Sequence, residues 1–147
     1  MATYLLIGLV IVLALTPLLH FLPSKRQRSQ ARMREKAAMN GLFVEFRDPP
    51  GRDRLPAERR QNLIYYGLRL PPAREPARGR CQWLRDGADW RSLGARVPAP
   101  APLSDLPEEV VAAAIDEGSC GVYWQEEGGE ERVEQIHRAL RDWAQIA

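Results

Sequence analysis

The side chains best suited to chemistry in this 147-residue chain are two cysteines and the single histidine beyond the N-terminal apolar stretch. A thiol or imidazole acts as nucleophile or general base only beside a group that activates it. Cys81, Cys120 and His137 have no such neighbour at recognisable spacing. The two cysteines fall at inward-looking strand positions, and His137 lies beside an apolar helical stripe near Glu134 and Arg141. We therefore predict buried thiols, a histidine at the core boundary and no catalytic residue.

Metal and cofactor motifs are also lacking. The cysteines form no CxxC pair and no zinc-type cluster with histidine, and no phosphate loop or GxGxxG motif occurs. Four glutamates could attract a cation, but they lack the alternating spacing of a calcium loop and suit a solvated turn before a helix: Glu126, Glu127, Glu130 and Glu131. We predict no metal and no cofactor.

A cluster of basic residues is the strongest candidate for binding. It follows an apolar stretch, contains one acid (Glu35), and comprises Lys25, Arg26, Arg28, Arg32, Arg34 and Lys36. Four of these cations recur three or four residues apart, on one stripe of a predicted helix. Anionic headgroups would attract each of them by about 1 kcal/mol near the surface. The cluster predicts contact with membrane lipid. The alternative is that it only sets the orientation of an anchor.

Residues 3–22 contain no acid, lysine or arginine. At about 1.5 Å per residue they would form a helix roughly 30 Å long, the thickness of the hydrocarbon core. A cleaved signal peptide is the alternative, but the sequence lacks its basic start and small-residue cleavage site. Because basic residues flank cytoplasmic ends of membrane spans, we expect an external N-terminus and a cytoplasmic C-terminal part in a bacterial inner membrane.

Length and composition allow one small domain beyond this anchor, with 45% hydrophobic and 27% charged residues. Only Lys25 and Lys36 are lysines among 21 basic residues, which is typical of a GC-rich genome; selection for bidentate arginine contacts is the alternative. Basic residues dominate the first hundred positions and acidic residues dominate from residue 101 onward. These two parts should partly neutralise each other or present faces of opposite sign.

Several short segments have strand character. The best is 62–70, rich in β-formers, and Asp86-Gly87 predicts a hairpin turn. Loops are expected at 48–60 and at the prolines Pro71, Pro72 and Pro76, and an extended connector at 97–103. The predicted strands are 42–46, 62–70, 80–85, 90–93 and 120–125.

Three helices are predicted after the anchor. The first spans 25–39, between an N-cap at Ser24 and a C-cap at Asn40-Gly41. The second runs from Ser104 or Asp105 to Gly118, because Pro107 suits a first turn and Gly118 an end. The third ends near Ile146. Its core-facing stripe consists of Val133, Ile136, Leu140 and Trp143.

These elements predict an α+β fold: a small, mostly antiparallel sheet with helices packed on one face. The expected organisation is an anchor at 1–23, a basic juxtamembrane helix at 24–41 and a small cytoplasmic domain at 42–147. Four tryptophans could form a stacking platform for nucleic acid, but in so small a domain they are expected in the core, so nucleic acid is not favoured: Trp83, Trp90, Trp124 and Trp143.

The layout resembles the YajC family, small accessory subunits of the bacterial preprotein translocase. The similar stretch is Leu22-Pro23-Ser24-Lys25-Arg26-Gln27-Arg28 and the helix after it. The family's Gly-Asp-x-Val-Val-Thr-x-Gly-Gly segment is absent, and two predicted C-terminal helices depart from its pattern. The resemblance implies a membrane span, a basic helix and a small β-containing domain. It implies no functional residue.

Together these features predict a non-enzymatic, single-pass inner-membrane protein whose domain binds another protein as an accessory or scaffold. One alternative is a regulator that binds anionic lipid through residues 25–36. A second, which the resemblance implies, is a translocase accessory subunit. An unrecognised enzyme is a third.

Overall fold

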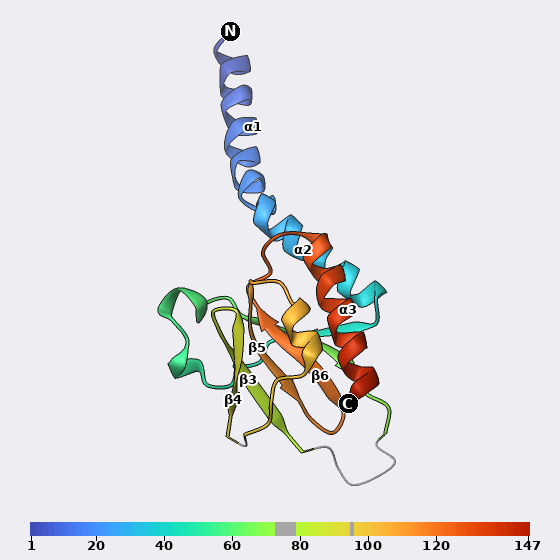
Figure 1. The fold of residues 1–147 in the computed structure, drawn as a ribbon. Helices are drawn as coiled ribbons and strands as arrows, with labels where there is room; N and C mark the ends of the chain where they lie inside the picture. The colour runs from blue at the N-terminus through green and yellow to red at the C-terminus, as the bar shows by residue number, and fades with distance from the viewer. Residues whose placement is uncertain (73–78, 95) are drawn as a thin grey trace.

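A computed structural model describes residues 1–72, 79–94 and 96–147. Figure 1 shows one long helix that projects away from a layered domain. The projecting helix is α1 (Ala2–His20), followed closely by α2 (Lys25–Met39), and the chain ends in α3 (Glu130–Ile146). The predicted α+β class is confirmed.

Six antiparallel strands form a single sheet with the order β1-β2-β6-β5-β3-β4. All but one were predicted as strands, although the ends shift by a residue or two. Their bounds are β1 (Leu42–Glu45), β2 (Ile64–Arg69), β3 (Cys81–Asp86), β4 (Asp89–Leu93), β5 (Val110–Ile115) and β6 (Ser119–Trp124).

One face of the sheet carries the main core. The helices α2 and α3 lie side by side on this face and contact β1, β2 and β6 (Figure 1), and the 3-10 helix η3 (Ala101–Asp105) packs against α3. The predicted stripe of α3 is buried here, and Trp83 meets Trp143 edge to face with ring centroids 5.6 Å apart. Trp124 is also buried and Trp90 is half-buried, so the tryptophans belong to the fold as expected.

The opposite face has no long helix over it among the described residues. Its buried cluster contains Tyr65, Leu84, Val111 and Tyr123. Leu55 joins this cluster from the segment between β1 and β2, which holds the short helices η1 (Arg52–Arg54) and η2 (Ala57–Arg59). The two faces of the sheet therefore differ: helices cover the first, and an arginine-rich loop partly covers the second.

The predicted helix at 104–118 is wrong. Only η3 is helical in this region, and β5 follows it as a central strand between β3 and β6. Val110 to Ala113 are all buried, and Ala112 and Ala113 pair with both β3 and β6. An alanine-rich run is compatible with a helix by local propensity, but tertiary pairing outweighs propensity here. Gly118 belongs to the β5–β6 hairpin turn, where Asp116 N–H donates to Ser119 O at 2.9 Å.

Two smaller expectations also change. The connector predicted at 97–103 ends in the first residues of η3, with Pro102 and Leu103 buried. Pro76, placed in a predicted loop, lies outside the described residues. Ser24 does cap α2, and its reciprocal bonds with Gln27 form a capping box, while Asn40 and Gly41 end the helix as predicted.

A pair of glycines shapes the second face. Gly67 and Gly121 are directly opposite each other on β2 and β6. The Tyr65 ring lies over Gly121, where an added Cβ would come within 2.3 Å of its Cζ atom, and Phe43 lies over Gly67 in the same way. Glycine is needed at both positions because these rings occupy the space of a side chain.

We expect Gly121→Ala to lower the free energy of unfolding by about 1–3 kcal/mol, because the new methyl group displaces the Tyr65 ring. Urea unfolding of the full-length chain in detergent measures this change. The matched control is Gly118→Ala, whose Cβ would meet only Asp116 Oδ1 at 3.9 Å. Equal stability of both variants would contradict the described packing.

Candidate binding surfaces

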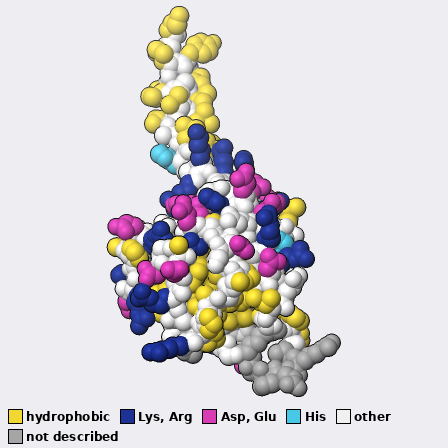
Figure 2. All heavy atoms as spheres, in the orientation of Figure 1, with side chains coloured by type: hydrophobic (Ala, Val, Ile, Leu, Met, Phe, Trp, Pro, Cys, Tyr) yellow, Lys and Arg dark blue, Asp and Glu magenta, His cyan; other side chains and the backbone are white. Residues whose placement is uncertain are grey.

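The helix α1 makes no buried contact with the rest of the molecule. None of its residues is buried, and its mean hydropathy of 2.4 is that of a helix able to cross a membrane by length and composition. Figure 2 shows hydrophobic side chains along this projecting rod and basic side chains gathered where it meets the domain. An isolated apolar helix in water would be unfavourable, so this surface requires an apolar partner or a bilayer.

The six basic residues singled out in the sequence divide into two groups in the structure. Lys25, Arg26, Arg28 and Arg32 are exposed on α2. Arg34 and Lys36 are half-buried and each contacts a carboxylate of the domain. Four of the six cations therefore remain open to an external anion, while two hold α2 in place.

Arg34 makes the most enclosed ion pair of the described residues. Its Nε and Nη2 donate to the two carboxylate oxygens of Glu126, both at 2.8 Å, and Tyr66 Oη donates to Glu126 Oε1 at 2.8 Å. The Glu126 side chain is only 1% exposed, whereas that of Arg34 is 38% exposed. Burial and the adjacent Glu126 raise the pKa of Tyr66, so its hydroxyl stays a donor. We call Arg34, Tyr66 and Glu126 the α2 clamp.

The α2 clamp joins segments that are far apart in the chain. Glu126 follows β6 with a positive φ of 52°, which turns its side chain toward β2 and α2. Lys36 adds an outer contact with Glu134 of α3 at 2.8 Å. The basic N-terminal part and the acidic C-terminal part thus neutralise each other in part, as the charge asymmetry indicated. Met33 and Ala37 of α2 are buried in the main core, so hydrophobic packing also holds the helix against the sheet.

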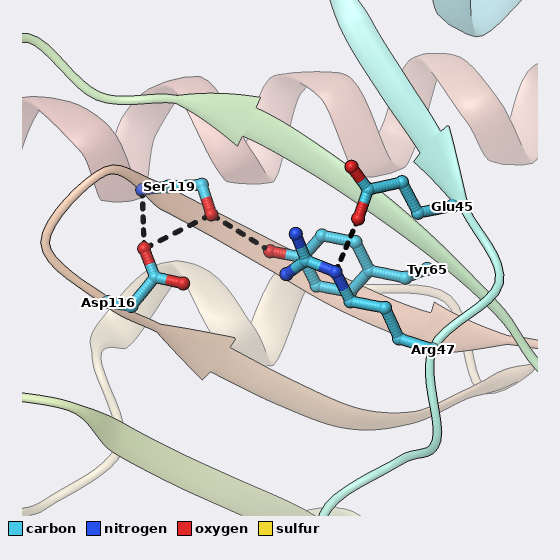
Figure 3. Close-up of polar contacts among 5 residues, drawn as sticks. All are labelled: Glu45, Arg47, Tyr65, Asp116 and Ser119. Carbon is cyan, nitrogen blue, oxygen red and sulfur yellow. Dashed lines mark hydrogen bonds and ion pairs between the residues drawn. The ribbon is translucent and has the colours of Figure 1, made fainter.

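A polar network crosses the second face of the sheet (Figure 3). The guanidinium of Arg47 lies over the Tyr65 ring, 4.4 Å from its centroid, and pairs with Glu45. Tyr65 Oη is 3.4 Å from Ser119 Oγ, which lies 3.3 Å from Asp116 Oδ1. This contact is possible because Gly121 lets the ring lie flat across β6.

The surroundings of Tyr65 and Asp116 shift the pKa of both groups. Burial raises the pKa of Tyr65 to about 12, so its phenol is neutral at physiological pH. Partial burial opposes ionisation of Asp116, but backbone N–H bonds from Gly118 and Ser119 outweigh it and hold the pKa below its ordinary value. Asp116 is therefore a weak base that caps a turn, and Ser119 has no strong base beside it in the network.

Next to this network, two arginines stack on the ring of Phe43. Phe43 has Arg69 at 5.0 Å and Arg47 at 5.8 Å from its ring centroid. Arg47 and Arg69 are exposed, while Phe43 is half-buried. We call Phe43, Arg47 and Arg69 the arginine face. Arg47 pairs with Glu45, whereas Arg69 makes no ion pair among the described residues, so the stacked guanidinium of Arg69 keeps its N–H edge available for a carboxylate of an acidic partner.

The other predicted residues lie apart from one another. Cys120 is buried as predicted, whereas Cys81 is only half-buried; neither forms a disulfide among the described residues, and both lie on the helix-covered side. His137 is half-buried; burial and the nearby Arg141 lower its pKa. Within the described residues, no three metal-ligating side chains form a group. The expectation that a solvated turn explains all four glutamates is wrong for Glu126, which is buried in the clamp.

Comparison with known proteins gave no relative: no family model, no curated protein and no solved structure matches this chain. The layout-based resemblance to translocase accessory subunits stays a prediction from sequence.

Two features escaped sequence analysis. Arg34 and Glu126 are 92 residues apart, and no local pattern pairs them. One sequence feature could have indicated the arginine face. Gly67 and Gly121 interrupt strand segments that contain tyrosines, and an isolated glycine in a strand often marks the close approach of another group.

The clamp makes a clear prediction about stability. Arg34→Ala leaves a buried carboxylate with only Tyr66 as donor, so we expect it to lower the free energy of unfolding by about 3 kcal/mol. Lys36→Ala is the control, because Lys36 lies on the same helix and its more exposed pair with Glu134 of α3 should contribute less than about 1 kcal/mol. Denaturant unfolding of the full-length protein in detergent compares them, and similar losses would contradict a special role for Glu126.

Proposed function

We propose that this chain is a single-pass membrane protein whose domain serves as a non-enzymatic binding module for another protein. The observation that carries the proposal is that α1, an apolar helix with no buried residue, is followed closely by the basic helix α2, which the α2 clamp holds against the sheet. In this arrangement α1 lies in the bilayer and α2 holds the domain next to it. The cations at the start of α2 support a cytoplasmic domain, because basic residues flank the cytoplasmic ends of membrane spans.

The binding surface proposed for the partner is the arginine face. Arg47 and Arg69 are exposed there, whereas the other face of the sheet is covered by α2 and α3. The charge of this surface favours a partner that presents acidic side chains. The pKa of Tyr65 is raised and that of Asp116 is lowered, so the phenol is neutral and the carboxylate is a weak base at pH 7. Neither group is suited to act as a general base, which also supports a binding role.

A second candidate function is regulation through anionic lipid. The specific support is the exposure of Lys25, Arg26, Arg28 and Arg32, four cations directly after the apolar helix. Each would contribute about 1 kcal/mol near an anionic surface, and the contribution fades beyond about 8 Å at physiological salt.

Topology can be tested with two single substitutions. We expect a membrane-impermeant thiol reagent to label Ala2→Cys, which precedes the apolar stretch 3–22, and not Ser104→Cys, in cells whose outer membrane alone is opened. Both positions are exposed in the folded chain, so burial does not explain a difference. After the inner membrane is also opened, Ser104→Cys should react. Labelling of Ser104→Cys before that step would overturn the cytoplasmic assignment.

Charge reversal separates the two candidate functions. The full-length protein is extracted in mild detergent, and the stoichiometry of co-purifying protein and anionic lipid is measured. We expect Arg69→Glu and Arg47→Glu/Arg69→Glu to lose a stoichiometric protein partner, because acidic side chains would be repelled. Arg28→Glu/Arg32→Glu should keep that partner and lose anionic lipid.

Unfolding midpoints verify that each variant is folded. A partner retained equally by the Arg69 variants would contradict docking on the arginine face. Loss of a partner only in the Arg28/Arg32 variant, together with anionic lipid, would favour the lipid-regulated function.

A further inference from the structure

A cavity of about 410 Å³ opens on the second face of the sheet, on the β3–β4 side. Its apolar lining comes from Leu55, Leu84, Leu93 and Val111. Gly51 helps to form it: the backbone there has φ of 61°, and an added Cβ would come within 2.8 Å of Leu84 Cδ1. The η1 segment therefore packs closely against the strands beside the cavity. This volume is within the range of pockets that hold small molecules.

Four arginines line this cavity: Arg54, Arg59, Arg85 and Arg91. Among the described residues, the only carboxylate that lines it is that of Asp86, which pairs with Arg91. The side chains of Arg54 and Arg59 contact no carboxylate of the described residues. An excess of uncompensated positive charge around an apolar floor is unfavourable unless an anion or salt screens it.

Arg85 differs from the other three because it is partly buried. Its guanidinium lies 4.9 Å from the centroid of the Trp90 ring, and its Nη2 donates to Leu106 O at 3.0 Å. Its Nε is buried and has no hydrogen-bond partner among the described residues. Burial and repulsion from Arg59 lower the pKa of Arg85, although Glu108 and Glu109 attract it. Arg85 is thus held by Trp90 and Leu106, and Arg91 by Asp86, so Arg54 and Arg59 are the lining arginines left to contact an anion.

We propose that this cavity binds an organic phosphate: a phosphomonoester group carried on a compact apolar body. Guanidinium groups match phosphate oxygens in bidentate geometry, and Arg54 and Arg59 have N–H groups free for this contact. A phosphomonoester carries nearly two negative charges at pH 7, which suits a site with two uncompensated arginines, Arg54 and Arg59. The leucine floor would bury the apolar body. This proposal goes beyond the binding function above and depends neither on the membrane anchor nor on a protein partner.

Phenyl phosphate is the probe, titrated by calorimetry into the full-length protein in a nonionic detergent. We expect saturable one-to-one binding that weakens as salt is raised. We expect Arg54→Ala/Arg59→Ala to weaken it by about tenfold or more, because charge-assisted hydrogen bonds are lost. Arg138→Ala is the control, because Arg138 is equally exposed but lies on α3, away from the cavity, and should change binding by less than twofold.

Phenol and inorganic phosphate complete the test. Both should bind at least tenfold more weakly than phenyl phosphate, since each has only one of the two recognised parts. Arg54 and Arg59 are exposed, so the double variant should keep the wild-type unfolding midpoint. Absence of saturable binding at millimolar phenyl phosphate would overturn the proposal. So would unchanged binding in the folded double variant, or equal binding of phenol.

Discussion

The buried carboxylate of Glu126 is the constraint on which the arrangement of this molecule depends. An isolated carboxylate in a protein interior would be strongly destabilising, so the fold must supply donors. It supplies three, two from Arg34 on α2 and one from Tyr66 on β2. Because the helix bearing Arg34 begins only a few residues after α1, the same ion pair fixes the apolar helix to the domain through a short connection.

This constraint explains why the two faces of the sheet differ. The clamp holds α2 to β2 and to the segment after β6, and α2 and α3 together cover one face with the main hydrophobic core. The other face is left to a loop that contributes Leu55 and several arginines. Arginines stack on Phe43 and Tyr65 there, which keeps their charge at the surface while the rings stay largely covered. The result is a surface rich in guanidinium groups, suited to anions.

Sequence patterns predicted the elements whose signals are local. The apolar run of α1, the Ser24 cap, the β3–β4 hairpin and the periodic stripe of α3 each need only neighbouring residues. The strand β5 could not be predicted this way, because its identity depends on pairing with β3 and β6 on either side. The clamp and the cavity share that difficulty. In the sequence, Glu126 resembles three neighbouring glutamates that are solvated, because only the folded chain brings Arg34 and Tyr66 to it. Arg54 and Arg85 are likewise distant in the sequence and line one cavity only in the folded domain.

Hydrogen exchange of the full-length protein in lipid nanodiscs tests the clamped arrangement most directly. The account predicts that amides of residues 33–39 in α2 exchange as slowly as those of β6, because both belong to one packed unit. Arg34→Ala should then accelerate exchange in α2 more than in β5 or β6. Rapid exchange of residues 33–39 in the wild-type protein, beside a protected sheet, would show that α2 is not held by Glu126 and would contradict the account.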